Sequence, residues 1–307
     1  MDYLAIMAGL VGLFLGGEAL VRGSVSIAHR MSISPFVIGL TVVGFGTSTP
    51  ELLVSVQAAL KGVPDIAIGN IVGSNIANVL LIVGVTALVW PIHVAGSALR
   101  RDTTIMILSA LALVPLFAMG EIGRVAGLTL VAGLIAYLVW TFLKPQQEAS
   151  DDEAEVEAAA TPIVNALLWG TLGLVGLLFG ARFLVDGAVS VAQDFGVSEA
   201  FIGLTIVAIG TSLPELATSL IAAFRHQSDI AIGNIVGSNI FNVLGILGVT
   251  SIVAPIPVAP RFLTFDLPIM IVVSIVLTGL LLLHQKIGRR TGAVMLLAYC
   301  AYLLTAH

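Results

Sequence analysis

Two glutamates stand inside segments that are otherwise almost entirely apolar. Glu51 lies in the sequence GTSTPELLVS, and Glu215 lies in the sequence GTSLPELATS. An ionisable side chain near the centre of a bilayer costs about 2.5–3.5 kcal/mol on insertion scales, so such a residue is a functional candidate by default. Neither segment contains a Lys or Arg that could neutralise its glutamate. We therefore expect the two carboxylates to bind a cation; the alternative is a protonated, hydrogen-bonded structural role.

A proline precedes each glutamate. Pro50 and Pro214 lack a backbone N–H, and each ring clashes with the carbonyl four residues earlier. The break predicted there frees backbone carbonyls beside four hydroxyls, those of Thr47, Ser48, Thr211 and Ser212. Unwound backbone at membrane depth is tolerated where it lines a polar cavity. For Thr47 or Thr211 alone, a hydrogen bond back to the preceding helical turn is an equally good expectation.

Two further segments, GNIVGSNIANV and GNIVGSNIFNV, combine amides with hydroxyls. Ser74 and Asn78 lie four residues apart on one helical face, and Ser238 and Asn242 repeat this spacing. We expect these four side chains to face the site. The other asparagines of the segments lie on other faces, where an amide often bridges two helices: Asn70, Asn75, Asn234 and Asn239.

The assembled ligands are carboxylate, amide, hydroxyl and carbonyl oxygens. Such hard ligands select calcium, magnesium, sodium or potassium over zinc or copper, and calcium takes six to eight of them. The five histidines fall in predicted loops or at the C-terminus, and Cys300 is the single cysteine, so no transition-metal site is expected. No nucleophile–histidine pair indicates an enzyme, and no basic patch indicates nucleic-acid binding.

The chain around these residues has the composition of an integral membrane protein. Of 307 residues, 58% are hydrophobic and 10% are charged, whereas a soluble domain carries about 25% charged residues. The net charge of −5 comes from residues 144–161, where six acidic residues accompany Lys144. This stretch cannot bury a core and is predicted to be a hydrated cytoplasmic linker.

An internal repeat divides the chain into two halves. The twelve residues DIAIGNIVGSNI occur at 65–76 and again at 229–240, and this offset of 164 aligns 33 identities in 51 positions. The predicted domains are a first half at 1–143, the linker at 144–161 and a second half at 162–307. Ten apolar spans are expected, at 3–21, 34–60, 66–90, 103–119, 124–143, 163–185, 199–224, 230–254, 262–283 and 291–305.

Five spans per half is an odd number, so equivalent helices must cross the membrane in opposite directions. The expected fold is therefore all-α, with ten transmembrane helices in two inverted five-helix repeats and broken helices at the ion site. Loops after odd-numbered spans hold nine Lys and Arg residues and loops after even-numbered spans hold four. By the positive-inside rule both termini are expected outside a prokaryotic cytoplasmic membrane.

The paired motifs GTSTPELLVS/GTSLPELATS and GSNIANV/GSNIFNV resemble those of the calcium/cation antiporter superfamily, specifically its sodium/calcium exchanger branch. The resemblance covers essentially the whole chain. It implies exchange of sodium for calcium by alternating access at a midplane site, with three sodium ions per calcium and with the first and sixth helices sliding against the bundle. The implied ligands are Glu51, Glu215, Thr47, Ser48, Thr211, Ser212, Ser74, Ser238, Asn78, Asn242 and the carbonyls of Gly44 and Ala208.

Several related functions compete with this interpretation. Potassium-dependent relatives carry aspartate where this chain has Asn242, which argues against potassium coupling. Proton-coupled relatives lack the Pro-Glu pairing, which makes a proton-coupled calcium antiporter the second candidate. A cation channel is less expected, because paired half-sites in inverted repeats suit alternating access better than a continuous pore. The expected partners are calcium, sodium and membrane lipid, with no cofactor and no obligate protein partner.

Overall fold

The computed structural model describes residues 2–31, 33–93, 97–143, 161–195 and 208–305, and these are helical apart from two short strand pairs. The α elements are α-helices and the η elements are wider π-helical turns. The first half contains α1 (Asp2–Met31), α2 (Pro35–Ile38), η1 (Gly39–Val43), α3 (Gly44–Thr47), α4 (Thr49–Leu60), α5 (Pro64–Ala77), η2 (Asn78–Ile82), α6 (Val83–Val89), β1 (Ile92–His93), α7 (Ser97–Ala118), β2 (Glu121–Ile122) and α8 (Arg124–Leu143).

The second half repeats this order from the sixth predicted span onward. It contains α10 (Ile163–Asp194), α12 (Ala208–Thr211), α13 (Leu213–Phe224), α14 (Ser228–Phe241), η4 (Asn242–Leu247), α15 (Gly248–Val253), β3 (Ile256–Pro257), η5 (Phe262–Asp266), α16 (Leu267–His284), β4 (Lys286–Ile287) and α17 (Arg289–Thr305). Within the described residues, seven helices are long and apolar enough to cross a membrane, and eight if the bent segment from Pro35 to Leu60 is one span.

Two predicted features lie partly beyond the described residues. The linker at 144–161 is described only at Thr161, and the span at 199–224 only from Ala208. The number of ten spans therefore stays a prediction. The first and sixth helices are also longer than the predicted spans 3–21 and 163–185, because α1 continues to Met31 and α10 to Asp194. Each helix continues because its partner packs beside it well past the apolar stretch.

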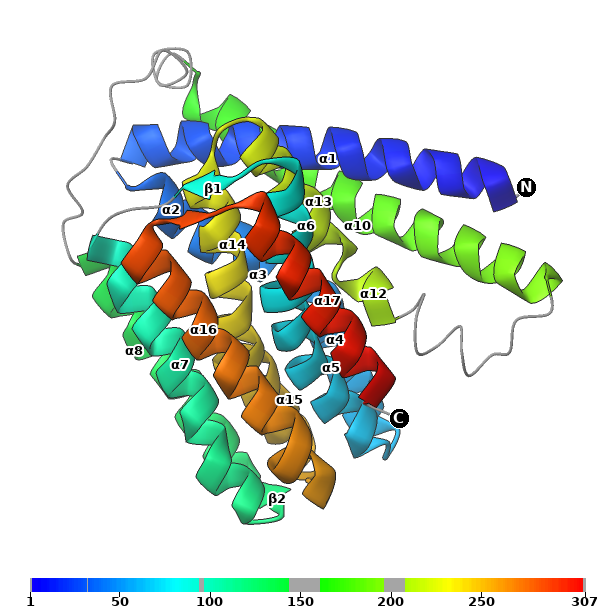
Figure 1. The fold of residues 1–307 in the computed structure, drawn as a ribbon, viewed down its shortest axis with the longest axis vertical. Helices are drawn as coiled ribbons and strands as arrows, with labels where there is room; N and C mark the ends of the chain where they lie inside the picture. The colour runs from blue at the N-terminus through cyan, green and yellow to red at the C-terminus, as the bar shows by residue number, and fades with distance from the viewer. Residues whose placement is uncertain (1, 32, 94–96, 144–160, 196–207, 306–307) are drawn as a thin grey trace.

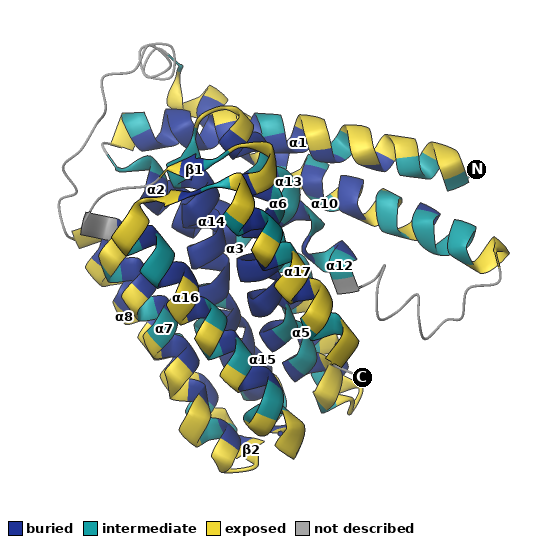
Figure 2. Ribbon diagram, viewed as in Figure 1, coloured by how far each residue is buried: buried dark blue, intermediate teal, exposed yellow. Residues whose placement is uncertain are grey.

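Burial places the repeated motifs at the centre of the molecule. The helices α5 and α14 carry them, and α14 is buried along almost its whole length (Figure 2). The outer faces of α7, α8, α16 and α17 expose large apolar side chains such as Val125 and Leu297. An apolar exterior is what a bilayer requires, because lipid offers no hydrogen bonds.

The helices α1 and α10 lie against each other over most of their length, to one side of the bundle (Figure 1). A Cβ at Gly16 would lie 2.5 Å from the backbone N of Leu177, and one at Gly180 would lie 2.6 Å from the backbone N of Leu13. Residue numbers rise along α1 as they fall along α10, so these two equivalent helices are antiparallel. Gly16 and Gly180 therefore face the partner helix and permit the close approach of the two backbones.

Two strand pairs join the halves at opposite ends of the bundle. The strand β1 pairs antiparallel with β4, and β2 pairs antiparallel with β3. Figure 1 shows β1 near the end at which α1 crosses the bundle and β2 at the far end. By the repeat offset β1 and β3 are equivalent, and they lie at opposite ends of the molecule.

Two buried aspartates, Asp102 and Asp266, occupy equivalent positions in the two halves. Asp102 accepts hydrogen bonds from Arg101 Nε at 2.6 Å and from its Nη2 at 2.9 Å. The equivalent Asp266 lies 3.4 Å from Arg261 Nε and accepts a hydrogen bond from Tyr302 at 3.0 Å. Both carboxylates are paired with arginine, which is the condition for burying a charge at tolerable cost.

Candidate cation site

The helix break predicted from Pro50 occurs two residues earlier, at Ser48. The helix α3 ends at Thr47 and α4 begins at Thr49, and the two parts of the span are bent by 43°. The second half breaks equivalently at Ser212, between α12 and α13. Each glutamate thereby falls in the first turn of a half-helix, where the positive end of the helix dipole stabilises a negative charge.

The two carboxylates are held by hydroxyls from the opposite half. Ser48 Oγ donates to Glu215 Oε1 at 2.9 Å, and Ser212 Oγ donates to Glu51 Oε1 at 3.4 Å. Both glutamate side chains are fully buried. No arginine or lysine among the described residues forms an ion pair with either of them. Two negative charges are thus brought together without a protein cation.

The asparagine amides of the third and eighth predicted spans also form hydrogen bonds between the two halves. Asn78 Nδ2 donates to Asn239 Oδ1 at 3.0 Å, and Asn242 Nδ2 donates to Asn75 Oδ1 at 2.9 Å. Asn78 and Asn242 are also the first residues of the π-helical turns η2 and η4, and such turns are frequent at functional sites. These hydrogen bonds use the amide nitrogens of Asn78 and Asn242 and leave their amide oxygens unused.

Eleven buried side-chain oxygens of the described residues lack a hydrogen-bond partner, and four of them belong to these glutamates and asparagines. These four are Glu51 Oε2, Glu215 Oε2, Asn78 Oδ1 and Asn242 Oδ1. Buried polar atoms are normally paired, and each unmet acceptor costs about 1–3 kcal/mol. Two carboxylate and two amide oxygens match the hard ligands that calcium and sodium prefer, which makes these four atoms candidate ligands for a cation.

A second group of predicted ligands lies around the carbonyl of Gly44. Ser238 Oγ donates to Gly44 O at 3.2 Å. Thr47 Oγ1 lies 3.3 Å from the same carbonyl and 3.2 Å from Asn234 Oδ1. The Thr47 hydroxyl therefore does bond back to its own helical turn, while its lone pairs remain available as an oxygen ligand.

Two asparagines form hydrogen bonds with the backbone carbonyls of the glutamates. Asn70 Nδ2 donates to Glu51 O at 3.0 Å and to Ser55 Oγ at 2.9 Å. Asn234 Nδ2 makes the equivalent bonds, to Glu215 O at 3.3 Å and to Ser219 Oγ at 2.9 Å. These contacts fit the helix-bridging role predicted for both residues, because they fix the backbone that carries each carboxylate.

The other three predicted ligands are located by the helices that carry them. Ser74 is buried in α5, Thr211 is the last residue of α12, and Ala208 is its first. Their part in ion binding stays a prediction.

Sequence reasoning missed an aromatic contact beside the site. The rings of Phe45 and Phe241 stack with centroids 4.3 Å apart and an interplanar angle of 22°. Each follows or precedes a predicted ligand, Gly44 or Asn242. The repeat places Ile209 and Ala77 at the equivalent positions, so only one half supplies these rings. A comparison of the two halves would have revealed this asymmetry.

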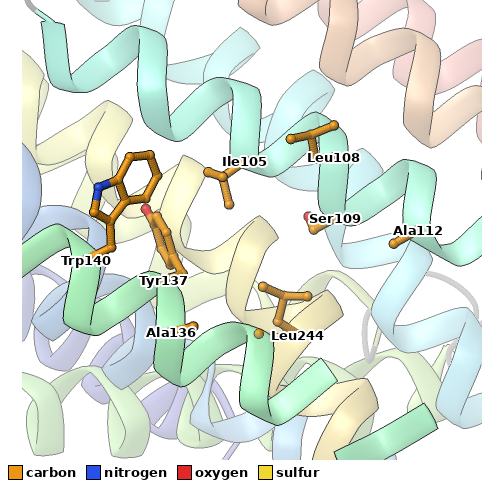
Figure 3. A pocket seen from close by; sticks show the side chains of 9 residues that line it. Ile105, Leu108, Ser109, Ala112, Ala136, Tyr137, Trp140 and Leu244 are labelled. Atoms are coloured by element: carbon orange, nitrogen blue, oxygen red, sulfur yellow. The ribbon is translucent and has the colours of Figure 1, made fainter. Parts of the chain in front are cut away.

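A separate groove of about 360 Å³ lies between α7 and α8 (Figure 3). Its lining is almost wholly apolar, with Leu244 of η4 alongside and the rings of Tyr137 and Trp140 at one end. The complete lining is Ile105, Leu108, Ser109, Ala112, Gly133, Ala136, Tyr137, Trp140 and Leu244. No carboxylate lines this groove, so it is distinct from the cation site.

The sequence matches one family of known proteins. Residues 1–143 and 165–306 match the family model described as sodium/calcium exchanger protein. The chain belongs to this family. It is therefore a member of an antiporter family and an integral, multi-pass membrane protein.

Individual relatives of the family match nearly the whole chain. The candidate antiporter CaxA of Alkalimonas amylolytica is 41% identical over 97% of this chain and 96% of its own length. The sodium/calcium exchanger MaX1 of Methanosarcina acetivorans is 32% identical over 99% and 98%. The solved structure of the sodium-calcium exchanger NCX_Mj superposes with a TM-score of 0.86 at 33% identity, covering 100% of this chain and 98% of that one.

Proposed function

We propose that this protein exchanges sodium for calcium across a cytoplasmic membrane by alternating access at the Glu51–Glu215 site. The observation that carries the proposal is the set of four unpartnered buried oxygens, contributed equally by the two halves. Their two carboxylates give the empty site a formal charge of −2, which one calcium ion neutralises. The remaining predicted hydroxyl and carbonyl ligands complete the six to eight oxygens that calcium takes.

The architecture favours a transporter over a channel. Ten spans in two inverted repeats would place a site formed by both halves near the membrane midplane. The antiparallel packing of α1 and α10 supports this inversion, as does the position of equivalent strands at opposite ends. The termini are proposed to lie outside, with the acidic segment 144–161 on the cytoplasmic side.

Sodium is the proposed coupling ion because the site contains two carboxylates and a neutral amide at Asn242. Asn242 contributes a neutral oxygen, so no third carboxylate is present to bind a potassium ion together with calcium or to release a proton. The similarity to MaX1 and NCX_Mj, both named as exchangers of sodium and calcium, supports the same assignment.

The test is uptake of calcium-45 into proteoliposomes with sodium, potassium or protons as the sole outward gradient. The proposal expects saturable uptake that requires the sodium gradient. Uptake driven equally well by a proton or potassium gradient would reassign the coupling ion. Unitary conductance without coupling would make the protein a channel.

A further inference from the structure

An ion pair ties the α1–α10 pair to the rest of the molecule. The carboxylate of Glu18 in α1 accepts a hydrogen bond from Arg225 Nε at 2.9 Å and a second one from Arg225 Nη2. Arg225 directly follows α13. Forked pairs of this kind are the stronger class of ionic hydrogen bond. Glu18 also accepts from Arg22 Nε, one turn further along α1, at 2.7 Å.

Two other contacts between the α1–α10 pair and the bundle are apolar. Gly17 of α1 faces the side chain of Ile221 in α13, and Gly46 of α3 faces Leu174 of α10. Apolar surfaces of this kind permit packed helices to slide past one another. Among the ion pairs of the described residues, Glu18–Arg225 is the one that crosses this boundary.

The internal repeat places two like charges at the positions equivalent to this ion pair. Adding 164 to Glu18 leads to Arg182 in α10, and subtracting 164 from Arg225 leads to Lys61 at the end of α4. The equivalent of an attractive pair is therefore two cations. Arg182 instead lies 3.6 Å from Asp186 of its own helix. In the described structure α1 packs along α13, but the equivalent helices α10 and α4 do not pack along each other.

We propose that Glu18 and Arg225 form a charge latch that favours one of the two access states of the exchanger. The inference rests on the proposed alternating access, in which inverted halves exchange their conformations. In the state described here α1 lies on α13 and the latch is closed. In the exchanged state α1 leaves α13 and α10 approaches α4, so the attraction is lost and Arg182 meets Lys61.

Both charge effects act in the same direction. By the positive-inside rule Arg225 lies on the cytoplasmic side, so the latch holds that side closed and Lys61 disfavours closure of the outer side. Glu18 is 16% exposed and Arg225 is 49% exposed. A partly exposed ion pair contributes about 0.2–1 kcal/mol, which corresponds to roughly a 1.4- to 5-fold change in the population ratio for each effect. The bias should weaken at high salt, because salt screens exposed charges.

Three variants separate the latch from a merely structural contact. Glu18→Gln opens the latch, whereas Lys61→Glu creates an attraction to Arg182 in the exchanged state and removes no ion pair of the present one. Arg22→Gln is the matched control, because it removes the other partner of Glu18 but leaves the connection to α13. Lys61 is exposed at the end of a helix, so its replacement should not impair folding.

The measurement is the distance between spin labels on α10 and α4, in the full-length reconstituted protein without sodium or calcium. Exposed Phe179 and Leu60 are replaced by cysteine for labelling, in a Cys300→Ser background. We expect Glu18→Gln and Lys61→Glu each to raise the ratio of the short-distance to the long-distance population about 1.4- to 5-fold, and Arg22→Gln to leave it unchanged. An unchanged distribution in Lys61→Glu, or an equal shift in Arg22→Gln, would overturn the latch.

Failure of the latch and failure of the proposed function give different results. The distance distribution reports the two states whichever ion is transported. If the unmodified protein takes up no calcium against sodium, the proposed function fails even where the labels report both states. If uptake is normal and the labels do not respond to Lys61→Glu, only the latch fails.

Discussion

Each glutamate of the site has one oxygen held by a serine and one oxygen left open. The proposed cation site rests on these unpartnered oxygens of Glu51 and Glu215, together with those of Asn78 and Asn242. Sequence spacing predicted these four residues, because a charge inside an apolar span and an amide four residues after a serine are both visible in one dimension. Which oxygen of each side chain stays open depends on hydrogen bonds between the halves, and no spacing rule gives those.

A change of Asn242 to aspartate should make transport pH-dependent. Asn242 Nδ2 donates to Asn75 Oδ1 in the protein, and an ionised aspartate cannot donate. It would also add a third negative charge beside the two glutamates. We expect calcium uptake by Asn242→Asp to fall several-fold as the pH rises, because only the protonated carboxyl can replace the amide as a donor. Initial rates of uptake between about pH 5 and pH 9 provide the measurement, with the unmodified protein as the control for general pH effects; parallel profiles would contradict the argument.

At the scale of the elements, glycines set how closely α1 and α10 approach. Gly16 and Gly180 stand at matched positions of the repeat, and small residues permit close helix packing, but a small residue does not identify the helix that it contacts. The broken helices were predictable from Pro50 and Pro214, since a missing N–H ends a helix locally. The buried aspartates Asp102 and Asp266 were not singled out, because burial depends on neighbours far away in the sequence.

Replacing Gly16 by alanine should destabilise the protein more than a change at a comparable open glycine. The new methyl group would meet the Leu177 backbone, which cannot rotate away. Overpacking of this kind costs about 1–3 kcal/mol, so we expect a lower unfolding temperature for Gly16→Ala. Gly133→Ala in α8 is the control, since no atom of the described residues lies within 4 Å of its Cβ position. Equal unfolding temperatures for the two variants would show that α1 and α10 are packed less tightly than described.

At the scale of the whole molecule, the two halves share one site and differ in its surroundings. The bonds from Ser48 to Glu215 and from Ser212 to Glu51 are equivalent by the repeat. So are the bonds from Asn78 to Asn239 and from Asn242 to Asn75. The stacked pair of Phe45 and Phe241 does not follow it. The repeat was fully evident in the sequence, because twelve identical residues recur. The conformational difference between the halves was not, because identical segments can adopt different packing in each half.

The proposed exchange moves charge across the membrane. One calcium neutralises the two glutamates, whereas three sodium ions leave the site at +1, so each cycle carries one net charge. A charge crossing 100 mV is worth about 2.3 kcal/mol. We expect an inside-positive potential to speed sodium-driven calcium uptake into proteoliposomes several-fold, because the cycle then moves positive charge outward. The potential is clamped with potassium and an ionophore, after potassium is shown not to be transported. Uptake that is indifferent to the clamp would indicate electroneutral exchange.

The central claim is that Glu51 and Glu215 bind the transported calcium together. Equilibrium binding of calcium-45 to the purified protein tests it most directly, with Glu51→Gln and Glu215→Gln compared against Glu121→Gln, an exposed glutamate on β2. We expect one calcium ion to bind per chain and sodium to displace it. The calcium affinity should be unchanged in Glu121→Gln. It should fall at least about a hundredfold in both site variants, since removing one partner of a buried charge pair costs about 3–5 kcal/mol. Calcium binding of unchanged affinity in either Glu51→Gln or Glu215→Gln would contradict the account.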